Sequence, residues 1–525
     1  MQATPEQLAI CESRAEVLKI KALAGTGKTT TLRGLAGRHR DKKILYLAFN
    51  KAIKEEAQGK FVKNVRAMTA HGLAFASVGK HFANTPNKLH HGELKPFHVL
   101  PLLSRSLKGV PPTIHNLYGA RVIETIRNYL ISPEVDLGDE HLSLSASPAE
   151  KKHFSPTQLM EDAEGIWMEM QDLRSLVPMT HDGYLKLFQR NLPDLGYDMV
   201  MVDEYQDTNP VLQSLVEIQP CRRVYVGDEH QAIYGFRGAH NAMATAQADE
   251  ELYLTGSFRF GQAIADMANT ILDAKGEKMS LRGLGAASEL CPIPFGATHT
   301  FISRGNSALF GRAVQALDRR EAFAFVGPIQ NYRLDLIEQV YRLSVRDRVS
   351  DPFLKAFKSF EELEEYATAM EDREIIGRCR LVTKYGGRIP TLVSQITSNA
   401  GTYPDKPGDA KVVLTSAHRS KGLEFANVQL ADDFMDFYDE EKEEWKDLTQ
   451  ASARDREEVN LQYVAATRAQ GRLEVGEKLQ KFWDHTQELA AQAKEKAARQ
   501  ALEPEVQIPE VAPTRMRFSR AQSPS

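Results

Sequence analysis

The sequence predicts an α/β protein built on parallel sheets, and three observations carry that prediction. Several apolar runs of four to six residues end directly in polar or glycine residues, as buried parallel strands do. Amphipathic helical patterns lie between these runs. A glycine-rich stretch that can cradle phosphates follows the first run. The runs are VLKIKA before residue 23, KILYLAF at 43–49, YDMVMV before Asp203, RRVYV before Gly227 and KVVLT at 411–415.

Composition narrows the class of protein. With 525 residues, 42% hydrophobic and 26% charged, we expect two to four ordinary globular domains. There is no apolar run of membrane-spanning length and no signal-peptide pattern, so we expect an intracellular, cytoplasmic protein without a membrane partner, nucleoid-associated if bacterial. The net charge of −4 gives no global sign of nucleic acid, although a motor needs only a local basic track. The four cysteines lie far apart, which argues against a zinc or iron–sulfur site.

The loop at 22–29, ALAGTGKT, has the spacing of a Walker A phosphate loop, with alanine at the usual first glycine. Lys28 would reach the β- and γ-phosphates of a nucleotide, and Thr29 would hold Mg²⁺. Backbone N–H groups at the helix start would hold the phosphate oxygens. The nucleotide-binding residues of this stretch are Ala24, Gly25, Thr26, Gly27, Lys28, Thr29 and Thr30.

A second motif, MVMVDEYQDTNP, completes the phosphate site. Asp203 ends an apolar strand, as a magnesium-binding Walker B carboxylate does, and Glu204 follows it in position to orient or deprotonate water. Adjacent carboxylates at a strand end favour a bound cation. A kinase would not need the glutamate, and the Asn-Lys-x-Asp signature of a GTPase is absent. We therefore predict hydrolysis of ATP with Mg²⁺.

Five motifs in fixed order point to one family. They are LAGTGKT, DEYQDTNP, VGDEHQAIYGFRGA at 226–239, SAHRSKGLEF at 416–425 and LQYVAATRA at 461–469. Over about its first 480 residues the chain resembles the UvrD/Rep-type superfamily 1 DNA helicases. Within that group LAFNKA, NYLISPE and LADDF make it most similar to bacterial-type relatives of the F-box DNA helicase, and no F-box is evident.

The resemblance implies roles around ATP. Gln7 would read the adenine edge and Phe258 would stack on the ring. Arg259 and Arg468 would contact the γ-phosphate, which couples hydrolysis to domain closure. Thr30 stands where relatives often carry an arginine against the adenine, so we expect a weaker grip on the base. The remaining implied roles are γ-phosphate sensing by Gln231 and ribose binding by Glu424.

The same resemblance implies a single-strand track. Phe49, Tyr234 and Phe236 match aromatics on which bases stack, although each aromatic alone would favour a core position. Lys421 would lie near the phosphates or the strand. The other residues matched to the strand side are Asn50, Thr69, His71, Arg237 and His418.

The resemblance also implies the architecture: two RecA-like P-loop motor domains of parallel sheets flanked by helices, each with a mainly helical insertion. We expect the first motor domain at 1–77 and 160–270, and its insertion at 78–159. We expect the second motor domain at 271–330 and 405–487, and a reduced insertion at 331–404. Residues 488–525 are expected to form a disordered tail.

These expectations describe an ATP-dependent translocase or helicase that binds single-stranded and tailed duplex DNA and moves 3′ to 5′, a direction that the family alone implies. One alternative is a translocase that strips proteins from single strands and separates duplex poorly. Another is a sensor or motor subunit of a larger defence or nuclease complex, with the C-terminal tail docking a protein partner.

Overall fold

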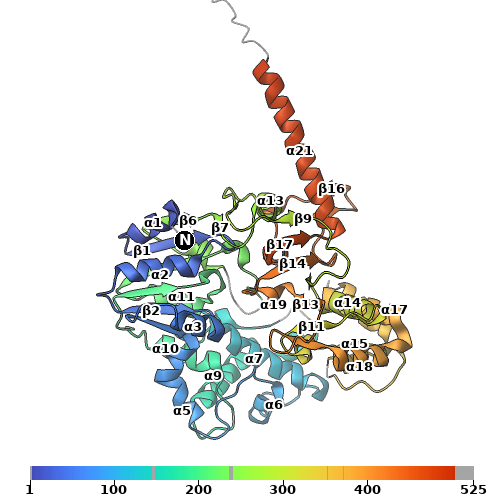
Figure 1. Cartoon of the computed structure of the whole chain (residues 1–525). Helices are drawn as coiled ribbons and strands as arrows, with labels where there is room; N and C mark the ends of the chain where they lie inside the picture. Colours follow the sequence, from blue (N-terminus) through green and yellow to red (C-terminus); the bar gives the residue numbers. More distant parts are fainter. Residues whose placement is uncertain (1–2, 145–147, 236–240, 352, 370–371, 503–525) are drawn as a thin grey trace, which may run out of the picture.

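Two parallel sheets organise the computed structural model, which describes residues 3–144, 148–235, 241–351, 353–369 and 372–502 (Figure 1). The first sheet has the strand order β3-β2-β4-β5-β1-β6, and the second has the order β12-β11-β13-β10-β14-β17-β9. Neighbouring strands are parallel throughout both sheets. The predicted α/β class is confirmed, and each apolar run forms a strand.

The first sheet is apolar on both faces, as its sequence pattern predicted. Ile44 and Tyr46 of β2 pack into one core cluster, and Leu45 and Leu47 pack into the cluster on the opposite face. Helices cover both faces, so chemistry is left to the strand ends. The strands are β1 (Val17–Ala22), β2 (Ile44–Ala48), β3 (Val65–Thr69), β4 (Met199–Val202), β5 (Arg222–Gly227) and β6 (Glu250–Leu254). The helices are α1 (Pro5–Glu12), α2 (Lys28–Arg38), α3 (Lys51–Gln58), α11 (Pro210–Glu217) and α12 (Ala242–Thr245).

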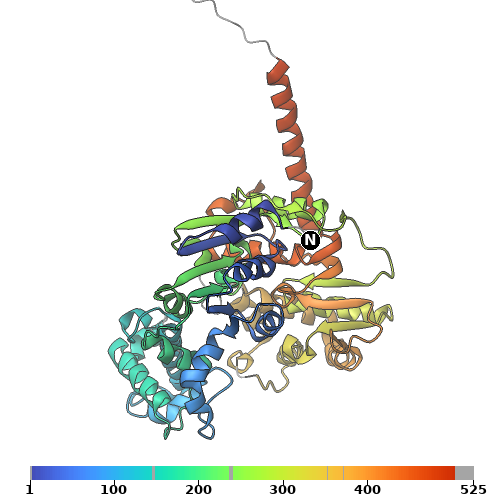
Figure 2. The same cartoon turned by 60° about the vertical axis from the view of Figure 1, so that its left-hand side comes forward.

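A helical insertion lies next to the first sheet, on the side away from α21 in both views (Figures 1 and 2). Its helices are α4 (Ala70–Ala74), α5 (Lys80–Ala83), α6 (Pro96–Val99), α7 (His115–Ile131), α8 (Pro148–His153), α9 (Pro156–Gln171) and α10 (His181–Arg190). The expected boundary at residue 159 falls inside this unit. Trp167 of α9 and Tyr184 of α10 share a core with Tyr129 of α7, because their apolar faces pack on α7 rather than on the sheet.

The second sheet follows the same plan. Its strands are β9 (Glu289–Leu290), β10 (His299–Ser303), β11 (Phe323–Val326), β12 (Gly401–Tyr403), β13 (Val412–Ser416), β14 (Phe425–Leu430) and β17 (Ala469–Glu474). Its main helices are α13 (Gln262–Ala274), α14 (Asn306–Asp318), α19 (Ala417–Ser420), α20 (Ala453–Ala466) and α21 (Glu477–Leu502). Two short two-stranded sheets are separate from it: β7 (Gly256–Ser257) with β8 (Arg282–Gly283), and β15 (Tyr438–Asp439) with β16 (Glu444–Trp445).

The second insertion consists of four helices against α14: α15 (Asp335–Ser344), α16 (Phe360–Ala369), α17 (Arg373–Tyr385) and α18 (Ile389–Asn399). Its expected end at residue 404 lies too far along the chain. Strand β12 pairs with β11 and therefore belongs to the sheet. Three residues are too short a run for periodicity to indicate a strand.

Helix α21 departs from the expected tail. It continues to Leu502, so residues 488–502 are helical rather than disordered, and it projects from the body of the molecule (Figure 1). Alanine, lysine, glutamine and glutamate, which dominate this stretch, are strong helix formers. The rest of the expected tail lies outside the described residues. Among the described helices, none is both long and apolar enough to cross a membrane.

Candidate nucleotide and nucleic-acid site

The phosphate loop joins β1 to α2 and needs glycine at two positions. Gly25 and Gly27 have φ values of +73° and +80°, in the left-handed region that favours glycine. A Cβ atom on Gly25 would lie 2.4 Å from Ser257 Oγ and 2.7 Å from Arg259 Cβ. Within the loop, the Thr26 hydroxyl donates to the carbonyl of Leu23 at 2.8 Å. The loop therefore packs closely against the segment that carries Arg259, with its helix start free to receive an anion.

The residues expected to hold Mg²⁺ lie together. Asp203 follows the end of β4, and the Thr29 hydroxyl donates to its Oδ2 at 3.4 Å. The Tyr46 hydroxyl donates to the same oxygen at 2.5 Å. Burial and the adjacent Glu204 raise the pKa of Asp203. A hydroxyl and a buried carboxylate fit magnesium, which would supply compensating charge and orient the phosphates.

Glu204 and Lys28 form an ion pair beside this carboxylate. Lys28 Nζ lies 2.9 Å from Glu204 Oε1. Burial opposes the charge of both groups, yet Lys28 and Lys421 lower the pKa of Glu204 to about 2. Glu204 has φ +53°, a left-handed conformation that costs a non-glycine residue energy and is typical of functional sites. The glutamate is thus held ionised, as a group that orients water must be.

The expected adenine and ribose residues flank the loop. A Cβ atom on Gly27 would lie 3.3 Å from Gln7 Nε2 and 3.6 Å from the Phe258 ring. Glu424 accepts from Arg259 Nε at 2.7 Å, and Arg259 Nη1 donates to the Thr467 carbonyl at 2.9 Å. Arg259 and Glu424 are therefore partners of each other here. Thr30 is exposed on α2.

Arg468 reaches the first domain from the second. It is 1% exposed, and its Nη2 donates to Gln231 Oε1 at 3.3 Å. Burial and the nearby Arg259 lower the pKa of Arg468 to about 9. Two cations held close together at a buried position favour an anion between them. We use the name interdomain seam for the buried polar residues of the nucleotide site described above, together with Arg468. They are Lys28, Asp203, Glu204, Gln231 and Arg468.

A cavity of 840 Å³ lies between the first sheet and its insertion, and we name it the strand-side cavity. Phe49 and Tyr234 line it with their rings stacked, 5.4 Å between centroids and 15° between planes. Asn50 and His71 also line it, and His71 Nε2 lies 2.9 Å from Asp182 Oδ1. Other lining residues include His91, Lys95, Arg127, His181, Asp182, Asp203 and Asp207.

The remaining strand-side predictions fall around this cavity. The Thr69 hydroxyl accepts from Gly72 N at 3.0 Å and caps α4. From the second domain, the His418 carbonyl accepts from the Tyr234 hydroxyl at 3.5 Å. Lys421 forms an ion pair with Asp207, which lines the cavity, and lies 5.1 Å above the Tyr234 ring. Phe236 and Arg237 lie outside the described residues.

Sequence reasoning missed several members of the site. Asp228 follows β5 as Asp203 follows β4, a signal that could have found it. It accepts from Gln231 Nε2 at 2.7 Å. Asp182 and His181 come from α10, and no pattern in the sequence links that helix to Phe49.

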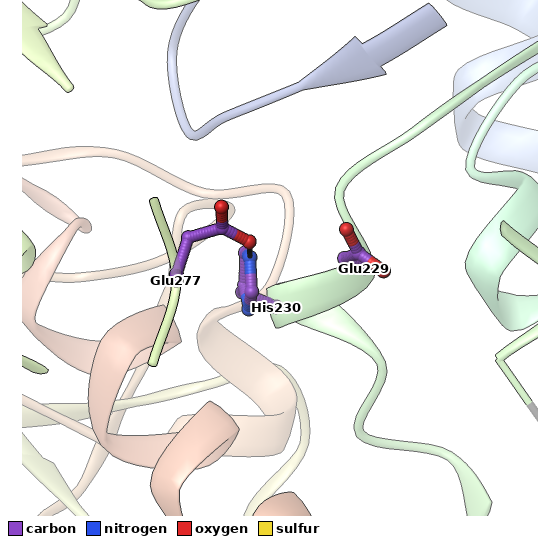
Figure 3. Close-up of side chains that lie close together, drawn as sticks. All are labelled: Glu229, His230 and Glu277. Carbon is purple, nitrogen blue, oxygen red and sulfur yellow. Dashed lines mark hydrogen bonds and ion pairs between the residues drawn. The ribbon is translucent and has the colours of Figure 1, made fainter. Parts of the chain in front are cut away.

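A separate cluster, Glu229, His230 and Glu277, has the residue types of a metal site (Figure 3). His230 Nε2 lies 2.7 Å from Glu277 Oε2, and Lys275 Nζ lies 3.0 Å from His230 Nδ1. Both ring nitrogens of His230 therefore already have a polar partner. Glu229 pairs with Lys21 at 3.3 Å. Lysines already balance the charge, so the arrangement favours a polar bridge over a metal centre.

Comparison with known proteins gives the family. Residues 6–237 match the model of an AAA domain, and residues 341–480 match the UvrD-like helicase C-terminal domain. The chain belongs to the UvrD-like superfamily 1 helicases. The two sheets of this UvrD-like chain are accordingly those of RecA-like motor domains.

Curated relatives agree with this placement. The F-box DNA helicase 1 of Gallus gallus is 34% identical over 484 residues, covering 87% of this chain and 47% of the relative. The F-box DNA helicase protein 1 of Schizosaccharomyces pombe is 32% identical over 522 residues, covering 91% and 58%. An ATP-dependent DNA helicase PcrA of Leuconostoc citreum is 32% identical over 122 residues, 21% of this chain and 16% of that one. The UvrD-like chain spans about half the length of the two F-box relatives.

Proposed function

We propose that the chain is an ATP-dependent translocase and helicase of single-stranded DNA that travels 3′ to 5′. It would unwind duplex or remodel protein–DNA complexes in repair, recombination or replication. The supporting observation is the interdomain seam, where Arg468 of one domain donates to Gln231 of the other, and Glu204, the ion-pair partner of Lys28, lies near enough to act on the charge of Arg468. Such a site hydrolyses ATP only when the domains are closed, so each turnover is coupled to a domain movement.

The strand-side cavity supports the choice of substrate. The stacked pair Phe49 and Tyr234 can hold bases of any sequence, and Lys95 and Arg127 can contact a phosphate backbone. Asp203 and Asp207 line the same cavity, so a bound strand would lie directly against the nucleotide motif. This adjacency gives a route from strand binding to hydrolysis.

The test is steady-state ATP hydrolysis with single-stranded DNA, single-stranded RNA or blunt duplex, in the presence of Mg²⁺. We expect strong stimulation by single-stranded DNA and loss of hydrolysis in Lys28→Ala. Unwinding of a 3′-tailed duplex, compared with a 5′-tailed one and with displacement of a bound protein at equal ATPase rate, separates helicase from stripping translocase. Hydrolysis that is indifferent to nucleic acid would overturn the proposal.

Helix α21 favours a second candidate, a motor subunit of a larger complex. Its distal part projects from the body with Leu489 51% exposed (Figure 1). In that case a partner would co-purify with the full chain and be lost on truncation after residue 490. An unchanged, partner-free chain with autonomous unwinding would exclude this candidate.

A further inference from the structure

Helix α20 and the residues just beyond it contact the segment 228–232 of the first domain at three points, beside a bond from Gly235 N to Glu457 Oε1 at 3.3 Å. Asn460 Nδ2 donates to the carbonyl of Ala232 at 2.8 Å, and Arg468, just beyond the helix end, donates to Gln231. Tyr463 lies between Asn460 and Arg468 in the chain, and its hydroxyl contacts the phosphate loop as well. Tyr463 is fully buried. The segment 228–232 is therefore the surface on which α20 rests.

The Tyr463 hydroxyl joins the two halves of the nucleotide site. It accepts a hydrogen bond from the backbone N–H of Ala24 at 3.0 Å and donates one to Asp228 Oδ2 at 3.2 Å. Asp228 Oδ2 also accepts from Gln231 Nε2, whose own amide oxygen accepts from Arg468. The hydroxyl, Asp228, Gln231 and Arg468 form a ring of bonds that the chain closes between Arg468 and Tyr463, and the phosphate loop joins this ring at the hydroxyl.

We propose that Tyr463 is a positioning residue that sets the height of Arg468 above the phosphate loop, by fixing α20 to Ala24 and Asp228. This inference rests on the proposed ATPase function and deepens it. Ala24 is buried, so its N–H has no solvent to replace the tyrosine oxygen. Separation of the domains would break the hydroxyl's two bonds together with the Arg468 bond, which makes closure an all-or-none step.

The geometry explains why a tyrosine serves here. A phenol both donates and accepts, and this site needs an acceptor for a backbone N–H and a donor for a carboxylate. Burial and the charge of Asp228 raise the pKa of Tyr463 well above its usual value, so the group keeps its proton. The rigid ring spans the gap without the rotamer freedom of a longer side chain.

The deciding variant is Tyr463→Phe, which removes one oxygen and keeps the ring. We expect kcat for DNA-stimulated ATP hydrolysis to fall by about 10- to 100-fold, as a misplaced catalytic group does. The KM for ATP should stay within about a factor of two, since uniform binding is untouched. Affinity for single-stranded DNA should not change. A kcat equal to that of wild type, or a rise in KM alone, would overturn the inference.

The matched control is Tyr332→Phe. Tyr332 is also buried, and its hydroxyl donates to the carbonyl of Val326 in β11 at 2.8 Å rather than to the phosphate loop. A general cost of deleting a buried hydroxyl would appear in both variants, and a positioning effect would appear only at Tyr463. Equal losses of kcat in the two variants would count against the proposal.

Hydrogen exchange of the loop peptide gives a readout without turnover. In the wild-type chain without nucleotide, the Ala24 amide should be protected, and Tyr463→Phe should accelerate its exchange while Tyr332→Phe does not. Fast exchange of that amide in the wild-type protein would overturn the inference even if the variant failed to fold. A wild-type chain that protects Ala24 but never hydrolyses ATP would instead contradict the proposed function.

Discussion

At the interdomain seam polar side chains are buried and bonded, whereas in the strand-side cavity the expected contact residues are partly open. Asp203 is 4% exposed and Gln231 5%, while Phe49 is 36% exposed. Phosphoryl transfer depends on groups fixed before reaction, and burial fixes them. A strand of any sequence needs open aromatic faces instead. Under the proposed function the two regions differ because one would perform chemistry and the other would hold a moving polymer.

The largest effect should follow a change of charge inside the seam. We expect Glu204→Gln to lower ATP hydrolysis by about 10²- to 10⁴-fold, because an amide cannot accept the proton of water. ATP affinity should remain, since Lys28 loses an ion-pair partner and stays available to phosphate. Turnover and nucleotide titration measure the two quantities.

The exposed Glu217, at the end of α11, offers the matched change Glu217→Gln. It should leave both quantities as in wild type. Full activity in Glu204→Gln would mean that the seam is not the hydrolytic site.

A smaller effect is expected from a change at the other end of α20. It tests whether buried ion pairs also hold α20 to the second insertion. Glu458 of α20 is buried and accepts from Arg304 Nη2 at 2.6 Å and from Arg373 Nη1 at 3.0 Å. Glu458→Ala should lower the free energy of unfolding by about 3 kcal/mol, the low end for a broken buried pair, because Arg373 is 40% exposed. Denaturant unfolding at pH 7 measures the change.

The same carboxylate gives a pH dependence. Burial opposes its charge, but the two arginines outweigh burial and hold the pKa of Glu458 below the usual 4.5. Its contribution to stability is therefore present above pH 4.5 and is lost as the pH falls through the lower folded value. The difference between wild type and Glu458→Ala should shrink in that range. The half-exposed pair of Glu338 and Arg342 provides a control, because it lies within one helix and its removal should leave stability nearly unchanged.

The smallest effect belongs to the cavity. Phe49→Ala should weaken single-stranded DNA binding by about 5- to 150-fold, the equivalent of about 1–3 kcal/mol for one stacked base. Hydrolysis without DNA should be unchanged, because Phe49 stacks on Tyr234 rather than on the seam. Fluorescence anisotropy with labelled oligonucleotide measures the affinity.

Phe97, in α6 of the first insertion, is 69% exposed and does not line the cavity, so Phe97→Ala is the control. An equal loss of affinity in both variants would place the strand elsewhere on the insertion.

The contrast between the two regions also explains what the sequence could predict. The loop at 22–29 directly follows one apolar run, and Asp203 directly follows another. Because each motif is an unbroken stretch of sequence, the sequence alone predicted that both lie at the ends of strands. The side of the strand-side cavity that α10 forms was not predictable. Asp182 and His71 are in contact although they are 111 residues apart in the sequence, and only the packing of α10 brings them together.

Insertion boundaries failed for a related reason. The sequence predicted that both insertions are mainly helical, but helical periodicity does not say which body a helix packs against. Helix α9 could have covered the sheet, and only its contacts with α7 assign it to the insertion. The bond between the Tyr463 hydroxyl and Ala24 was not predictable either, because it exists only in the assembled domains.

We propose that acids of the first domain and a cation of the second make one ATPase site. The most direct measurement compares ATP affinity and DNA-stimulated turnover in Arg468→Ala and Lys28→Ala. We predict that Arg468→Ala still binds ATP and loses about 10³-fold or more in turnover, as removal of an arginine finger does, whereas Lys28→Ala loses both. Turnover within a few-fold of wild type in Arg468→Ala would show that the second domain takes no part in hydrolysis.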